Sequence, residues 1–207
     1  MIKTLVDPKQ PKGAHAAAGL YLALIHHPVI NRRGEVITSA VTNLDLHDIS
    51  RAARTYGVRA VFCVTPLEDQ QQLIGRLIEH WTEGYGARFN PDRREALKLL
   101  RIAASLTETI AAVTACEQQA PQMVATSARP QPGTIACQKI GQRLADGIPQ
   151  LLLFGTASGL APEVIAAADA VLEPVVGCGV YNHLSVRSAA AIILDRLRFR
   201  RNGELAQ

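Results

Sequence analysis

Several features that often mark a protein's chemistry are scarce or missing in this sequence of 207 residues. Aromatic residues make up 4% of the chain, so the core has to be built mainly from alanine and aliphatic residues. The four cysteines, Cys63, Cys116, Cys137 and Cys178, stand far apart without Cys-x-x-Cys or Cys/His spacing, so no metal site is expected. Such isolated cysteines are typical of a reducing compartment, and we expect a cytoplasmic protein. No apolar run reaches the roughly 18 residues of a membrane helix, so no membrane span is expected.

Common nucleotide-binding and hydrolase motifs are also absent. The chain contains no GxxxxGK[ST], GxGxxG or GxSxG, so P-loop, dinucleotide-binding and α/β-hydrolase chemistry lose their usual sequence support. The net charge of +4 and the pI near 9.0 are compatible with a polyanionic partner without identifying one. Five arginines stand against one acid between residues 187 and 201. A solvated helix end explains this cluster as well as a polyanion contact does.

Short apolar runs alternate with helical patterns along the chain. The runs expected to be strands are Leu20–Ile25, Arg59–Val64, Lys98–Ala103, Gln122–Thr126, Gln150–Phe154 and Ala170–Leu172. The patterns expected to be helices are Leu44–Tyr56, Leu67–Trp81, Leu106–Gln118, Thr134–Ala145, Pro162–Ala168 and about Leu184–Arg200. This alternation predicts an α/β fold, a mostly parallel sheet flanked by helices, with ligands bound outside the carboxyl ends of the strands. Residues 1–18 lack periodicity and are expected to be a flexible leader before a single domain over residues 19–207.

Three segments that follow predicted strands are rich in small or polar residues. They are Thr126–Arg129, Gly155–Leu160 and Pro174–Ser185. Glycines at such turns permit positive φ and a close approach of the backbone to a ligand, so exposed backbone groups could recognise a nucleoside. The alternative is that Gly155 and Gly159 are only strand-to-helix turn residues, which is the commoner role of such a pair.

Four strings of the sequence resemble a known family. Tyr181–Ala190 leads directly into the last predicted helix and resembles the third signature segment of SPOUT-type RNA methyltransferases. Phe154–Leu160, with the pattern Phe-Gly-Thr-x-x-Gly-Leu, resembles their second segment. Ala23–Val29 and Val41–Ile49 resemble a prokaryotic group of predicted RNA methyltransferases in the same superfamily. The resemblance extends from about Leu20 to Arg198, which is nearly the whole predicted domain.

The resemblance implies a fold, a cofactor and two partners. It implies an α/β-knot methyltransferase domain with a C-terminal trefoil knot, a structured RNA substrate such as tRNA or rRNA, and a homodimer in which each partner completes the other's site. It also implies that S-adenosylmethionine (SAM) is held mainly by backbone groups of the three segments. A cationic sulfonium bound in this way needs no acidic fingerprint, and the segments contain no acidic residue. The cofactor-binding residues expected on this basis are Thr126, Ser127, Ala128, Phe154, Gly155, Thr156, Gly159, Leu160, Val176, Gly177, Asn182, Leu184 and Ser185.

The catalytic residues are less clearly marked. Methyl transfer needs a well-positioned acceptor, and a general base helps where that acceptor carries a proton. The acids and histidines that could serve as the base are Asp45, His47, Asp48, His26, His27 and His183. We favour Asn31 and Arg32 near the acceptor and Arg129 and His183 near the cofactor. Each has a structural alternative: a basic turn, a salt bridge at a strand end, or capping of the last helix.

Two other functions fit the same sequence. The first is a non-catalytic RNA-binding dimer with the same fold, which the weak evidence for a general base keeps open. The second is a small-molecule methyltransferase, for which a neutral or acidic surface around the three segments would be the sign. Methyl transfer to RNA is distinguished from both by its product and by salt-sensitive RNA binding.

Overall fold

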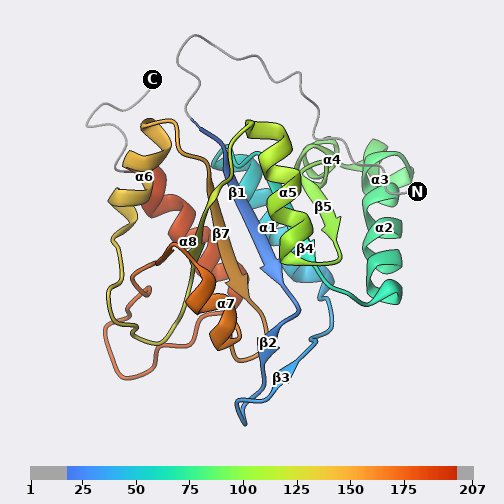
Figure 1. Cartoon of the computed structure of the whole chain (residues 1–207). Coiled ribbons are helices and arrows are strands. Elements are labelled where there is room, and N and C mark those ends of the chain that lie inside the picture. Colours follow the sequence, from blue (N-terminus) through green and yellow to red (C-terminus); the bar gives the residue numbers. More distant parts are fainter. Residues whose placement is uncertain (1–17, 200–207) are drawn as a thin grey trace.

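A six-stranded parallel sheet forms the centre of the computed structural model, which describes residues 18–199 (Figure 1). Its strands are β1 (Leu20–Ile25), β4 (Ala60–Val64), β5 (Leu100–Ala103), β6 (Gln122–Ala125), β7 (Gln150–Gly155) and β8 (Ala170–Val171). Their order across the sheet is β5-β4-β1-β7-β6-β8, and every neighbouring pair is parallel. The carboxyl ends of all six strands therefore lie along one edge. A small antiparallel hairpin, β2 (Val29–Ile30) and β3 (Val36–Ile37), projects beyond that edge (Figure 1).

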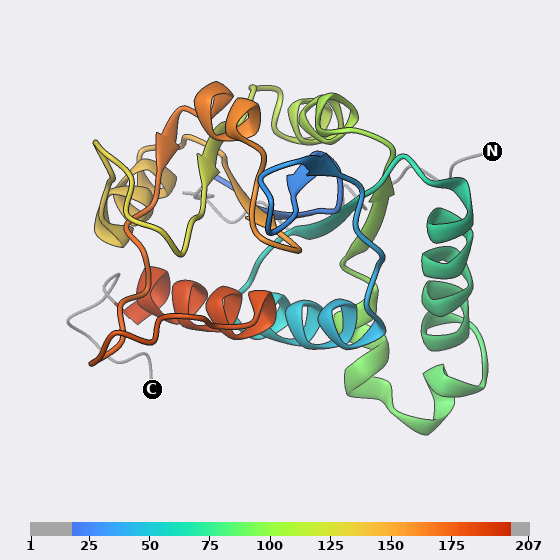
Figure 2. The ribbon, with the colours of Figure 1, turned by 90° about the horizontal axis from the view of Figure 1, so that it is seen from below.

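Helices cover both faces of the sheet (Figure 2). They are α1 (Asn43–Thr55), α2 (Glu68–Thr82), α3 (Tyr85–Phe89), α4 (Pro91–Leu97), α5 (Leu106–Glu117), α6 (Cys137–Ala145), α7 (Pro162–Ala167) and α8 (Val186–Phe199). The core on one face is formed with α1, α6 and α8, and α2 and α4 extend it past β5. The core on the other face is formed with α5 and α7. None of the helices described between residues 18 and 199 is long and apolar enough to cross a membrane.

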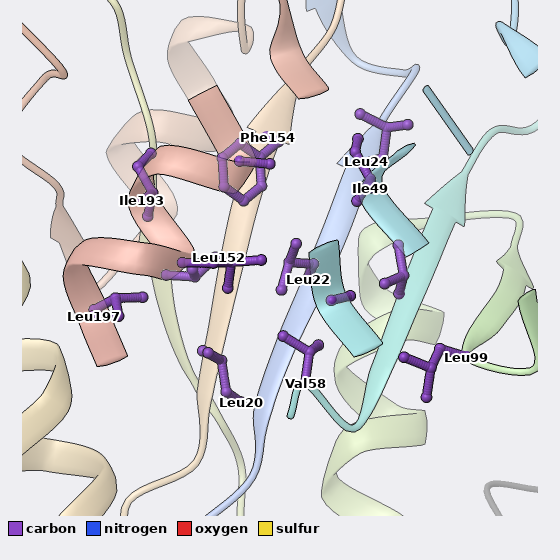
Figure 3. Packing of buried hydrophobic residues seen from close by; sticks show 14 of the residues in the cluster. Leu20, Leu22, Leu24, Ile49, Val58, Leu99, Leu152, Phe154, Ile193 and Leu197 are labelled. Atoms are coloured by element: carbon purple, nitrogen blue, oxygen red, sulfur yellow. The ribbon is translucent and has the colours of Figure 1, made fainter. Parts of the chain in front are cut away.

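The fully buried strand β1 shows why the sequence folds in this way. Its residues Leu20, Leu22 and Leu24 face the first core, and the alternate residues Tyr21, Ala23 and Ile25 face the second. Because both faces of the strand are covered, every position has to be apolar, and the run Leu-Tyr-Leu-Ala-Leu-Ile meets this requirement. In Figure 3 the leucines of β1 and Leu152 and Phe154 of β7 pack towards Ile49 of α1 and Ile193 of α8.

The predicted fold class is confirmed, with differences at the ends of elements. The last helix begins at Val186 instead of Leu184, because Ser185 caps it: the Ser185 Oγ accepts a hydrogen bond from the Ser188 N–H at 3.3 Å. The predicted helix from Thr134 begins only at Cys137, because Ile135 is extended and its N–H bonds to the carbonyl of Val171 at 2.8 Å. β2, β3, α3 and α4 were not predicted. The trefoil knot stays a prediction.

The two ends of the sequence lie outside the described residues. The predicted leader falls on residues 1–17, apart from Ala18, whose N–H donates to the carbonyl of Leu144 at 3.1 Å. Of the arginine-rich stretch, Arg200 and Arg201 lie beyond the last described residue.

Candidate functional site

Three loops meet at the carboxyl edge of the neighbouring strands β7, β6 and β8. They are loop A (Thr126–Arg129) after β6, loop B (Gly155–Leu160) at the end of β7, and loop C (Pro174–Ser185) between β8 and α8. Loops A and C are in direct contact, since the Asn182 Nδ2 donates to the carbonyl oxygen of Ala128 at 3.4 Å. The parallel order of the sheet thus brings together three segments that are separated by up to 59 residues, from Thr126 to Ser185.

Loop B is a tight turn that depends on its glycines. A Cβ atom added to Gly155 would lie 2.4 Å from the backbone nitrogen of Leu160, so no side chain fits there. Gly159 has a φ of 116°, which side chains rarely allow. The turn role considered for both glycines is therefore confirmed, and Leu160 at its end is buried. The turn lies at the carboxyl edge of the sheet, where ligands of parallel sheets bind.

The hydroxyl groups of loop A are used within the protein. The Thr126 Oγ1 donates to the carbonyl of Leu153 at 2.9 Å, next to the Thr126 N–H, which bonds to the same oxygen at 3.0 Å. The Ser127 Oγ donates to the carbonyl of Arg129 and accepts from the Arg129 N–H. These bonds shape the loop, and Arg129 is exposed at its end.

Loop C is the most exposed part of the site. Val176, Tyr181 and Leu184 are 68%, 78% and 41% exposed. With Ile192 and Arg196 of α8, loop C lines an open cavity of about 300 Å³; its loop residues are Val175, Val176, Gly177, Tyr181, Asn182, His183 and Leu184. His183 meets the ring of Tyr181 edge-on at 6.4 Å. The predicted cofactor residues Val176, Gly177, Asn182 and Leu184 are therefore brought to one surface.

The three loops fit the chemistry of SAM. Loops B and C contain no Asp, Glu, Lys or Arg, so a positively charged sulfonium would meet no permanent charge of its own sign in these two loops. The cavity beside loop C offers apolar wall from Val175, Val176 and Ile192, which suits an adenine ring. Arg196 in the same wall is a cation with which a carboxylate could pair. The apolar wall thus suits the nucleoside part of SAM, and the cation suits its carboxylate.

The hairpin carries the predicted acceptor-side residues. At its tip Asn31 is engaged in the turn: its Oδ1 accepts from the N–H groups of Arg33 and Glu35, and its Nδ2 donates to the Glu35 Oε2 at 2.6 Å. Asn31 therefore shapes the tip, and Arg32 and Arg33 are exposed beside it. Of the four predicted catalytic residues, Asn31 and Arg32 lie on the hairpin, Arg129 on loop A and His183 on loop C, so three separate segments carry them.

Backbone hydrogen bonds join the hairpin to loop B. The Ile30 N–H donates to the carbonyl of Gly159 at 3.0 Å, and the Ser158 N–H donates to the carbonyl of Ile30 at 2.9 Å. Val29 also forms an antiparallel bridge with Leu160. The base of the hairpin and the second predicted cofactor loop are thus one hydrogen-bonded unit.

A buried polar cluster lies beneath this unit. The His26 Nδ1 is 3.0 Å from the Ser39 Oγ, and the Ser39 Oγ is 2.5 Å from the Thr156 Oγ1. His26 is only 1% exposed, and this burial lowers its pKa to about 4, although the nearby Asp45 carboxylate opposes the change. His26 was considered as a base, whereas Ser39 was missed because no local pattern marks it.

The other candidate bases have structural partners. Asp45 is buried and accepts from the Arg187 guanidinium of α8 at 2.8 Å, and Asp48 lies 3.5 Å from the same group. His47 packs edge-on against Trp81, with ring centres 5.3 Å apart, and burial lowers its pKa. His27 hydrogen-bonds to Thr38 across the hairpin base at 3.0 Å. None of these contacts selects one of the six as the base.

Comparisons with known proteins identify the family of the chain. A family model described as SAM-dependent RNA methyltransferase matches residues 19–199. A protein of Oleidesulfovibrio alaskensis named tRNA (guanine-N(1)-)-methyltransferase is 44% identical over 178 residues, which are 86% of this chain and 41% of that protein. The chain therefore spans less than half the length of this relative. An uncharacterized protein of Aquifex aeolicus is 39% identical over 187 residues, 88% of this chain and 89% of its own length.

The fold has relatives among solved structures. The TrmH/SpoU tRNA modifying enzyme of A. aeolicus superposes with a TM-score of 0.53 at 16% identity, covering 90% of this chain and 76% of that one. At this identity the likeness concerns the fold alone.

Proposed function

The chain belongs to the SAM-dependent RNA methyltransferase family, and from this premise we propose that it transfers the methyl group of SAM to a nucleotide of a structured RNA, with tRNA the first candidate. The resemblance to SPOUT methyltransferases is thereby confirmed at the level of family and fold. The meeting of loops A, B and C at one sheet edge carries the proposal, because loops B and C contain no Asp, Glu, Lys or Arg and loop C offers an apolar wall. The name of the O. alaskensis relative supports tRNA as the substrate class.

In the proposed reaction a nitrogen or oxygen of the nucleotide forms a bond to the methyl carbon while the carbon–sulfur bond breaks. SAM supplies the electrophilic methyl group on a positively charged sulfur. The protein contributes by orienting the two reactants and excluding water, which accounts for much of the acceleration in such transfers. Where the acceptor is an N–H or O–H, its proton passes to a base or to water. We propose His183, which is exposed in loop C and lines the cavity, as that base.

The RNA side of the proposed site is the hairpin. Arg32 and Arg33 at its exposed tip would contact phosphates, and the Asn31 turn holds that tip in shape. The base of the hairpin is bonded to loop B, so an RNA bound there lies beside the cofactor loops. The role predicted for Asn31 therefore changes from contact with the acceptor to support of Arg32 and Arg33.

A homodimer is part of the proposal. Val180 and Tyr181 in loop C are 108% and 78% exposed, and Tyr181 also lines the open cavity. Exposed apolar side chains around an open binding site are typical of a surface that another chain covers. A second copy seated on loop C would close the cavity. A cytoplasmic location, where RNA is modified, belongs to the same proposal.

The test is the transfer of tritium from methyl-labelled SAM to unfractionated bacterial tRNA, with rRNA as a second substrate. We expect labelled RNA from the wild-type chain. The double variant Arg32→Ala/Arg33→Ala should have a raised KM for RNA. Its slope of log binding constant against log salt concentration should be smaller in magnitude by about two. The matched control Arg76→Ala, which removes an exposed arginine from α2, should behave as wild type.

Two results would reject the proposal in favour of the other functions. Salt-sensitive RNA binding without labelled RNA, under conditions where SAM binds, would identify a non-catalytic RNA-binding protein. Label in a small molecule and not in RNA would identify a small-molecule methyltransferase.

A further inference from the structure

Four polar groups form a continuous chain under the hairpin. The Thr156 Oγ1 donates to the carbonyl oxygen of Ile25 at 3.0 Å, at the carboxyl end of β1. The Ser39 Oγ lies 2.5 Å from the Thr156 Oγ1, and the His26 Nδ1 lies 3.0 Å from the Ser39 Oγ. We call this chain the relay. It connects residues from three separate places: the end of β1, the segment after β3, and loop B.

The hydrogen-bonding capacity of these groups gives the relay one direction. The carbonyl of Ile25 can only accept, so the single hydroxyl proton of Thr156 is directed to it. The Thr156 oxygen must then accept the proton of Ser39, and the Ser39 oxygen in turn accepts from His26. His26 is therefore the Nδ1–H tautomer. Its lowered pKa, about 4, keeps it neutral at physiological pH, so this tautomer persists.

The relay joins the outgoing side of the hairpin to loop B through side chains. The incoming strand β2 is bonded to loop B through Ile30 and Val29. The outgoing segment after β3 is joined to loop B by the side-chain bond from Ser39 to Thr156. The Ser39 N–H also donates to the carbonyl of His26 at 2.8 Å. A movement of loop B is thus transmitted to both strands of the hairpin, one through backbone and one through the relay.

We propose that the relay of His26, Ser39 and Thr156 couples the hairpin to loop B, so that a cofactor bound at loop B orders the hairpin, and RNA held by the hairpin strengthens cofactor binding. This inference rests on the proposed function, because it requires SAM at loop B and RNA at the hairpin. His26, Ser39 and Thr156 act in it as positioning residues. Since linkage is reciprocal, either half of the coupling can be measured alone. The half that needs no RNA is the more direct test.

The test is hydrogen–deuterium exchange of the full chain, with and without saturating SAM. In the wild type we expect SAM to slow exchange both in loop B and in residues 36–40, the latter by about fivefold or more, the lower end of typical coupling factors. Ser39→Ala breaks the relay outside loop B. It should keep the SAM-induced protection of loop B and lose most of the protection in residues 36–40. Ser39→Thr retains the hydroxyl and should restore that protection.

A control variant separates the relay from general loosening of the hairpin. Thr38→Val removes a neighbouring hydroxyl that bonds to the His27 Nδ1 and is not part of the relay. It should leave the SAM-induced protection of residues 36–40 intact. Equal protection of residues 36–40 in the wild type and in Ser39→Ala would overturn the proposed coupling while leaving the cofactor site in place. No protection of loop B in the wild type would instead reject the proposed function, and the coupling with it.

The direction of the relay has its own measurement. Nitrogen-15 NMR of the histidine rings in the wild type should show His26 neutral at pH 7, with the proton on Nδ1. A proton on Nε2 would contradict the direction derived from the Ile25 carbonyl, and with it the relay as a coupling element.

Discussion

The ion pair between Arg187 and Asp45 should contribute measurably to stability, although a single surface ion pair usually does not. Arg187 is in the first turn of α8, and its Nη1 lies 2.8 Å from the Oδ1 of Asp45 in α1. The Asp45 side chain is only 11% exposed, whereas the Arg187 side chain is 35% exposed. Removing the arginine leaves a largely buried carboxylate without its cation.

The size of the effect follows from this burial. A hydrogen bond to a charged group contributes about 1.5–3 kcal/mol, and solvent access to Arg187 places this pair in the lower half of that range. The second contact, to Asp48 at 3.5 Å, adds little because that carboxylate is 49% exposed. For Arg187→Ala we therefore expect the free energy of unfolding to fall by about 2 kcal/mol. For a domain of this size the Tm should fall by about 4–8 °C.

The assay is urea unfolding followed by far-ultraviolet circular dichroism. Arg54→Ala is the matched control: its pair with Glu95 spans 3.8 Å and both side chains are nearly half exposed, so a loss below about 0.5 kcal/mol is expected. A double-mutant cycle with Asp45→Asn should recover most of the Arg187 effect as a coupling energy. Equal, small losses in both arginine variants would refute the argument that burial of Asp45 sets the size of the effect.

Three further results are expected. Gly155→Ala should lower the free energy of unfolding by about 1–3 kcal/mol and abolish SAM binding in calorimetry, because its Cβ would lie 2.4 Å from a backbone nitrogen; wild-type behaviour would show that loop B adapts. Burial lowers the folded-state pKa of His26 to about 4, so below pH 6.5 the unfolded chain binds a proton at this residue more readily than the folded chain does. The contribution of His26 to the free energy of unfolding is therefore complete above pH 6.5 and is lost as the pH falls towards 4. Between pH 6.5 and pH 4 the free energy of unfolding of His26→Asn should therefore fall by up to about 3 kcal/mol less than that of the wild type. The same pH profile of urea unfolding in both proteins would contradict this. In analytical ultracentrifugation the wild type should sediment as a dimer of the 22.3 kDa chain, and the double variant Val180→Asp/Tyr181→Asp should sediment as a monomer. A double variant that remains a dimer would show that loop C lies outside the interface.

Local sequence patterns were sufficient for the central sheet. Strand β1 was predicted with its observed ends because six apolar residues in a row have one good environment, the interior of a sheet covered on both faces. The hairpin was missed because each of its strands has two residues, too few for a periodic signal. A signal was nevertheless present, since Asn31 and Gly34 bracket a turn in which Gly34 has a φ of 83°. Likewise Asn90-Pro91 marks the start of α4, with the Asn90 side chain accepting from the Arg93 N–H.

The candidate site was predictable in its loops and not in its contacts. Loops A, B and C follow predicted strands, so their meeting at one edge follows from a parallel sheet. The pairing of Ser39 with Thr156 spans 117 residues, and that of Arg187 with Asp45 spans 142. Such contacts depend on which strands become neighbours and how helices cross, and short-range spacing carries no information about either.

Calorimetric titration with SAM shows most directly whether the three loops form a cofactor site. We expect the wild type to bind one SAM per chain with a Kd in the micromolar range. Gly177→Val, where an added Cβ would meet only ordinary contacts, the nearest at 3.6 Å, should fold normally and lose most of this affinity. Gly75→Ala in α2, with a similarly open position, should bind as wild type. Absence of binding by a folded wild-type chain, or unchanged affinity in Gly177→Val, would contradict a cofactor site at these loops.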